Sequence, residues 1–99
     1  MEDLPDNAPI ELPIEDALDL HPFAPADVRS VVSSYLEEAA RAGFTEVRVI
    51  HGRGIGAQRQ AVRRVCARHP NVVDYADATP EKGGWGATVV RLKRTGATG

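Results

Sequence analysis

The hydrophobic residues of this chain follow two different periods, and each period predicts one kind of element. Four short apolar runs are bounded by proline, glycine or charged residues, which is typical of β-strands. They lie at about residues 17–21, 46–51, 72–76 and 87–93. Because these runs are shorter than most helices, we expect four strands.

Two longer segments repeat their apolar residues at helical spacing. The first follows Pro25, which suits a first helical turn, and ends at Gly43. Its apolar stripe consists of Val28, Val31, Val32, Tyr35, Leu36 and Ala39. The second begins near residues 54–56 and runs to about Arg68. Its apolar face consists of Ala61, Val62, Val65, Cys66 and His69.

The predicted order of elements is β-α-β-α-β-β, and this order limits the fold. Two helices cannot cover both faces of a four-stranded sheet, so they should pack together on one face. We therefore predict an α/β fold, a two-layer α/β sandwich with a four-stranded mixed sheet and two helices.

The length of 99 residues allows one domain. We expect a flexible acidic lead-in at residues 1–14, a folded domain at residues 15–94 and a flexible tail at residues 95–99. The single cysteine, Cys66, is expected in the core. No apolar run approaches ~18 residues and the N-terminus is acidic. We therefore expect a cytoplasmic chain with no membrane partner, and we favour a monomer.

The net charge of −2 hides two regions of opposite sign. Residues 1–27 hold eight acidic residues and no Lys or Arg, which gives −8. Residues 28–99 hold all twelve Lys and Arg against six acidic residues, which gives +6. A folded part with this excess of positive charge suits a phosphate-bearing partner.

Two histidines stand at the ends of the first two predicted strands. His21 and His51 therefore fall where open α/β sheets bind their ligands. Asp19 lies on the same side of its strand as His21 and could orient the imidazole. Two histidines and an aspartate could provide acid–base catalysis or hold a metal. The alternative is that Asp19 and His21 only tie down loops.

A glycine-rich turn follows His51. The backbone N–H groups of Gly52 and Gly54 could approach an anion next to a helix N-terminus, and Arg53 could form two hydrogen bonds to a phosphate. The spacing matches neither the dinucleotide fingerprint nor the Walker loop. The glycines could also serve the strand–helix turn alone.

Four arginines at i, i+4 spacing follow on the second helix, and no acidic residue occurs between Ala57 and Asn71. These arginines are Arg59, Arg63, Arg64 and Arg68. They suggest a face that binds a nucleic-acid backbone, although a solvated face is the common alternative. Trp85, between glycines in the last loop, could stack on an unpaired base or pack over a helix end.

Three segments together resemble the signature blocks of the small MutS-related (Smr) domain family. They are Leu-Asp-Leu-His at 18–21, His-Gly-Arg-Gly at 51–54 and Gly-Gly-Trp-Gly-Ala-Thr-Val-Val at 83–90. The resemblance covers roughly residues 15–93 and implies a stand-alone Smr domain that binds nucleic acid. Many members act as endonucleases on DNA or RNA. The matching positions are Asp19, His21, His51, Gly52, Arg53, Gly54, Gly84, Gly86 and Thr88.

This resemblance implies a nuclease site in which His21 and His51 act as acid, base or phosphate ligands and Asp19 orients one of them. Arg53 and the glycine turn would hold the cleaved phosphate. The cofactor stays open, with a divalent metal such as Mg²⁺ as the candidate, and no metal ligand is assigned. Pro22 stands where the family usually has glycine. The alternative function is a non-catalytic module that recruits its partner to branched DNA or ribosome-bound RNA.

Overall fold

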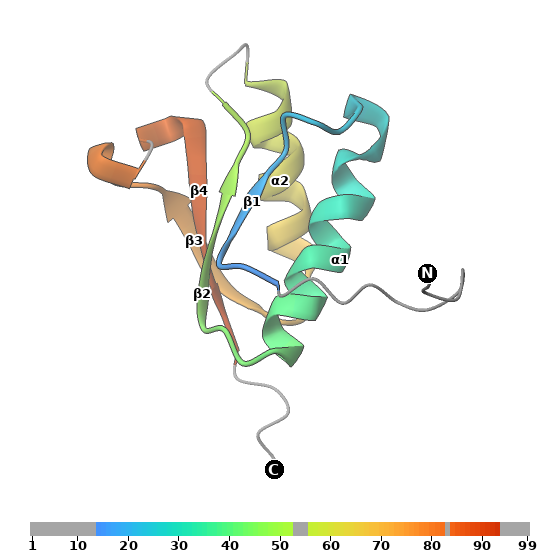
Figure 1. Ribbon diagram of the computed structural model, residues 1–99, viewed down its shortest axis with the longest axis vertical. Helices are drawn as coiled ribbons and strands as arrows, with labels where there is room; N and C mark the ends of the chain where they lie inside the picture. The colour runs from blue at the N-terminus through green and yellow to red at the C-terminus, as the bar shows by residue number, and fades with distance from the viewer. Residues whose placement is uncertain (1–13, 53–55, 83, 94–99) are drawn as a thin grey trace, which may run out of the picture.

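The structure, a computed structural model, describes residues 14–52, 56–82 and 84–93, with the Trp85 side chain excepted. It confirms the predicted fold class, with two helices on one side of a four-stranded mixed sheet (Figure 1). The strands are β1 Ala17–Asp19, β2 Glu46–Ile50, β3 Val72–Asp77 and β4 Ala87–Leu92. The helices are α1 Val28–Arg41 and α2 Ala57–Arg68. Three short 3₁₀ turns are η1 Pro25–Asp27, η2 Pro80–Lys82 and η3 Gly84–Gly86.

The sheet has the strand order β1-β2-β4-β3. β1 pairs with β2 in parallel, and β4 pairs antiparallel with both β2 and β3. Asp19 is the register partner of Ile50 in these two parallel strands. The segments that carry His21 and His51 therefore leave the sheet next to each other, at the carboxyl ends of β1 and β2. The topology therefore positions the two predicted histidine segments side by side.

The helical layer is held to the sheet by a core of small and branched apolar side chains. Val49 and Val90 from the sheet and Leu36 and Val62 from the helices are all fully buried in it. Gly43 ends α1, as predicted, with φ +99°. The N–H of Gly43 donates to the carbonyl of Ala40 and that of Phe44 to Ala39, the two bonds of a Schellman motif.

β1 is shorter than predicted, because it ends at Asp19 and not at residue 21. The backbone N–H of Leu20 still donates to the carbonyl of Ile50, but that of His21 turns to the Asp19 carboxylate. Pro22 has no N–H, and the next donor, Phe23, closes a turn onto the carbonyl of Leu20. A side-chain bond and a proline thus end the ladder and lift His21 out of the strand.

Candidate active site

His21 and Asp19 form an exposed pair directly after β1. Oδ1 of Asp19 accepts hydrogen bonds from the backbone N–H of His21 at 2.9 Å and from its ring Nδ1 at 2.5 Å. The backbone bond, and then the ring bond, hold the pKa of the Asp19 carboxyl below its usual value. An ionised carboxylate can only accept hydrogen bonds, so Nδ1 of His21 carries the hydrogen of this bond. Nε2 is then the ring nitrogen that can accept a proton from a substrate.

Gly52 lies against the free side of the His21 ring. A Cβ atom at this position would lie 3.2 Å from Nε2 of His21, and the backbone has φ +81°, a conformation that favours glycine. Both the close contact and the conformation require the absence of a side chain. The first residue of the predicted phosphate turn is therefore packed directly against the candidate reactive nitrogen.

His51, by contrast, is buried and uses both ring nitrogens inside the protein. Its side chain is 6% exposed. Nδ1 donates to the carbonyl of Gly52 at 2.9 Å, and Nε2 accepts a hydrogen bond from the Thr88 hydroxyl at 2.9 Å. Burial is the main reason why the pKa of His51 lies below its usual value. The ring is neutral and holds Gly52 in place.

Thr88 was predicted to contact nucleic acid, and for its side chain this prediction is wrong. The side chain is fully buried, on the face of β4 that packs under the helices. Its hydroxyl donates to His51, so Thr88 belongs to the support of the turn. The alternation of a strand places every second residue inward, and Thr88 shares the inward side with Val90.

The glycine segment before β4 completes this support. The carbonyl of Gly86 accepts the backbone N–H groups of both His51 and Gly52, at 3.0 and 2.8 Å. Gly84, the first residue of η3, has φ +57°, a conformation that favours glycine. Arg53, Gly54 and the side chain of Trp85 lie outside the described residues. Of the predicted site, Asp19, His21, His51, Gly52, Gly86 and Thr88 are brought together.

The four predicted arginines of α2 have two different environments, and their binding of a nucleic-acid backbone stays a prediction. Arg59 and Arg63 both bond to the Asp77 carboxylate of β3, with NH2–Oδ1 distances of 2.8 and 2.9 Å. Arg63 also lies over the ring of Tyr75. Arg64 and Arg68 are exposed on another side, since neighbours on a helix are about 100° apart.

Asp77 is a site residue that the sequence reasoning missed. The helix and its flanks hold no acidic residue between Ala57 and Asn71, and the acid that balances Arg59 and Arg63 comes from the next strand. The two arginine bonds hold the pKa of the Asp77 carboxyl below its usual value, with Arg59 the larger influence. Asp77 is two residues after Tyr75 on β3, so the two side chains point to the same face of the sheet, the face that α2 covers. This spacing is the sequence signal that could have identified Asp77 as a partner of α2.

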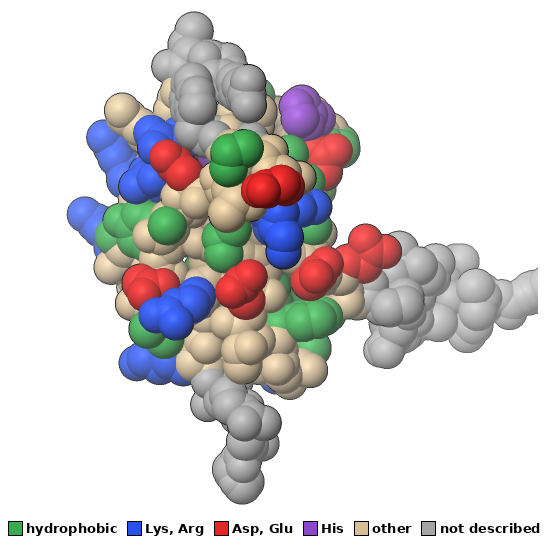
Figure 2. Space-filling model, turned by 90° about the vertical axis from the view of Figure 1, so that its left-hand side faces the viewer, with side chains coloured by type: hydrophobic (Ala, Val, Ile, Leu, Met, Phe, Trp, Pro, Cys, Tyr) green, Lys and Arg blue, Asp and Glu red, His purple; other side chains and the backbone are tan. Residues whose placement is uncertain are grey.

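Charged side chains of both signs are interspersed over the face seen in Figure 2, without a single continuous basic patch. Among the described residues, no group of three or more His, Cys, Asp or Glu side chains is placed to hold a metal ion. The alternative of a metal held by two histidines and an aspartate is therefore not assembled in this part of the chain. No described helix is long and apolar enough to cross a membrane.

Comparison with known families identifies the fold. The Smr domain family matches residues 18–93, which is most of the chain and includes all three blocks. The chain belongs to the Smr domain family. Its Smr domain superposes on the crystal structure of the Smr domain of Thermus thermophilus MutS2 with a TM-score of 0.75 and 40% identity. That match covers 80% of this chain and 99% of the other.

A second solved structure and two sequence relatives give the same assignment. YdaL, a stand-alone small MutS-related protein from Escherichia coli, matches with a TM-score of 0.69 and 29% identity, over 82% of this chain and 66% of YdaL. Endonuclease MutS2 of Caldicellulosiruptor bescii is 40% identical over 80 residues, and that of Thermus thermophilus 42% over 76. These matches cover 81% and 77% of this chain but only 10% of each relative.

Proposed function

We propose that this Smr domain binds nucleic acid and cleaves a phosphodiester bond in DNA or RNA. The observation that carries the proposal is the Asp19–His21 pair, which presents one free ring nitrogen beside Gly52. The names of the MutS2 relatives, which are endonucleases, support the same class of reaction. The charge of +6 on residues 28–99 favours a polyanion as substrate.

In the proposed reaction, Nε2 of His21 accepts the proton of the attacking hydroxyl, from water or from a ribose 2′-OH. The oxygen forms a bond to phosphorus, the bond to the leaving oxygen breaks, and the leaving oxygen takes a proton from water. Asp19 stabilises the imidazolium that results and keeps Nδ1 protonated throughout. His51 acts as a positioning residue, because its bonds to Gly52 and Thr88 fix the turn beside His21. Arg53 is assigned to hold the phosphate.

The test compares cleavage and binding in matched variants. Purified protein is incubated with labelled supercoiled DNA and single-stranded RNA, with and without chelator. His21→Ala should lower the cleavage rate by ~10²–10⁴-fold, the usual contribution of a general acid or base, and change affinity only slightly. Asp19→Asn should act in the same direction. Asp27→Asn, an equivalent change at the end of η1 and outside the site, is the control.

Equal losses of binding and cleavage in His21→Ala would show that His21 only binds the substrate and does not transfer a proton.

One feature favours the second candidate function, a module that binds nucleic acid without cleaving it. Pro22 offers no backbone N–H beside His21, where the family usually has glycine. If all variants bind and neither wild-type protein nor variants cleave either substrate, this second function is the correct one.

A further inference from the structure

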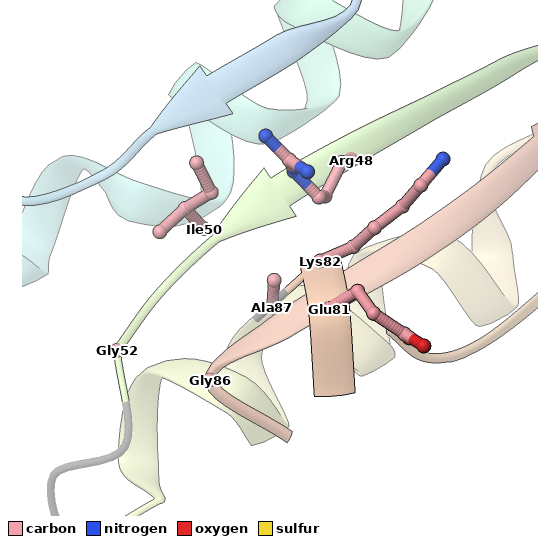
Figure 3. Close-up of a pocket in the computed structure, with 7 residues that line it drawn as sticks. All are labelled: Arg48, Ile50, Gly52, Glu81, Lys82, Gly86 and Ala87. Carbon is pink, nitrogen blue, oxygen red and sulfur yellow. The ribbon is translucent and has the colours of Figure 1, made fainter. Parts of the chain in front are cut away.

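The face of the sheet opposite the helices contains a hollow of about 400 Å³ that the predicted site did not include. Figure 3 shows its lining, which comes from β2, β4 and η2. At one end it is bounded by Gly52 and Gly86, the same glycines that form the His21 site. The hollow therefore shares Gly52 with the candidate reactive nitrogen, Nε2 of His21.

The base of the hollow is apolar. Ile50 and Ala87 lie directly opposite each other on β2 and β4, and both line it. Ile50 is half-buried, while Ala87 is almost fully covered. An apolar surface of this kind suits the flat face of a base or a sugar, since neither requires hydrogen bonds from the protein.

Two basic side chains, Arg48 and Lys82, line the hollow beyond its apolar base. Arg48 projects from the outer side of β2, and its Nε is buried with no hydrogen-bond partner. No carboxylate of the described residues lies within ion-pair distance of Arg48 or Lys82. A buried unpaired donor on a cation is costly, and a phosphate oxygen would satisfy it.

The acidic residues nearby limit how far a polyanion can extend. Glu81 also lines the hollow, but in Figure 3 its carboxylate points away from Arg48 and Lys82. A smaller hollow of about 80 Å³ continues from the same two basic residues and is bordered by Asp16 and Glu46. These carboxylates would repel a further phosphate, so the surface suits one phosphate beyond the reactive position.

We propose that this hollow binds one unpaired nucleotide next to the bond that is cleaved. Its base or sugar lies on Ile50, and its phosphate contacts Arg48 and Lys82. The inference rests on the proposed function, because His21 defines which bond is cleaved. The hollow specifies the class of substrate, because a nucleotide can enter it only when its base is not paired with another base. Single-stranded substrates should therefore be preferred to duplexes.

Binding in the hollow can be followed by NMR without any cleavage. A single-stranded hexanucleotide is titrated into the labelled full chain. The Ile50 methyl and Arg48 Nε–H signals are identified as those that disappear from the spectra of Ile50→Val and Arg48→Lys. We expect both signals to shift with the single strand, and the Ile50 signal to stay in place with a duplex of the same sequence. Shifts at His21 without shifts at Ile50 would overturn this inference and leave the proposed function intact. No shift at any residue would overturn both.

Affinity measurements with matched variants give an independent test. Arg48→Gln should weaken binding to the single strand about tenfold, and reduce the slope of log affinity against log salt by about 0.7. Lys82→Gln should act in the same direction, and Arg48→Lys should retain most of the affinity. Arg91→Gln removes the same charge from the same sheet face, where Arg91 is bonded to Asp74, and should change affinity less than twofold. Equal effects of Arg48→Gln and Arg91→Gln would overturn the proposal.

Discussion

The two histidines of the site carry the same side chain and have opposite environments. His21 is exposed and bonded on one nitrogen, whereas His51 is buried and bonded on both. Only His21 has a ring nitrogen available to a substrate. The sequence placed both histidines at strand ends, but the division of roles depends on Thr88, which is 37 residues away from His51 along the chain.

Gly52→Ala tests the contact between the turn and His21. The new methyl group would meet Nε2 of His21 at 3.2 Å, and the residue would keep a φ of +81°. We expect a loss of about 1–2 kcal/mol in the free energy of unfolding and a loss of most cleavage. Denaturant unfolding and cleavage assays measure the two effects. Gly43→Ala, at φ +99° with open space around it, is the control and should lower stability but not cleavage.

His51 makes the stability of the domain depend on pH. Burial lowers its pKa in the folded state, so the unfolded chain takes up this proton first as the pH falls through about 6.5. Stability should therefore be full above about pH 6.5 and decrease below it, by no more than about 1.4 kcal/mol per pH unit for one proton. Urea unfolding between pH 7.5 and 5 measures the slope. His51→Gln should flatten the slope, and an unchanged slope would show that His51 does not cause it.

At the scale of elements, the sequence predicted each helix and strand to within a few residues. Local periodicity and the signals from Pro25 and Gly43 are sufficient for that. What it could not predict is which residues of α2 face β3, because that depends on the crossing of the two elements. The ion pairs of Arg59 and Arg63 with Asp77 give these two arginines a different environment from Arg64 and Arg68.

Asp77→Asn tests whether this pairing limits nucleic-acid binding. The carboxylate occupies the donors of Arg59 and Arg63 that a phosphate would use. We expect the variant to bind single strands a few-fold more tightly and with a steeper salt dependence, because it removes the negative charge that Arg59 and Arg63 share. Asp74→Asn is the matched control, since Asp74 lies on β3 like Asp77 but pairs with Arg91 of β4. Equal gains from both variants would indicate an effect of net charge only.

At the scale of the molecule, charge is separated along the chain, with −8 in residues 1–27 and +6 in the remainder. A tethered acidic segment is present at high effective concentration near the folded domain, where it can compete with nucleic acid. Deletion of residues 1–13 should therefore tighten binding at low salt, and the difference should fade as the Debye length shrinks. Affinities of the two proteins at two salt concentrations measure this, and identical values at both would refute competition.

The overall architecture was accessible from the sequence because a small α/β chain has few ways to bury two amphipathic helices. The Asp19–His21 pair was also accessible, since it depends on two neighbouring residues. The hollow around Arg48 was not. It forms only where β2, β4 and η2 meet, and in the sequence Arg48 is simply a polar residue in an alternating strand.

β1 pairs with its neighbour over only three residues, yet it carries the reactive pair. Two anchors keep it in place: the fully buried Leu20 at one end, and at the other the hydroxyl of Tyr35, which donates to the carbonyl of Glu15 at 2.5 Å. A strand this short detaches at a lower free energy than the sheet unfolds. Detachment would separate His21 from Gly52 while the central strands remain paired. We therefore expect the fraying of one edge strand, and not the stability of the whole domain, to limit the lifetime of the assembled site.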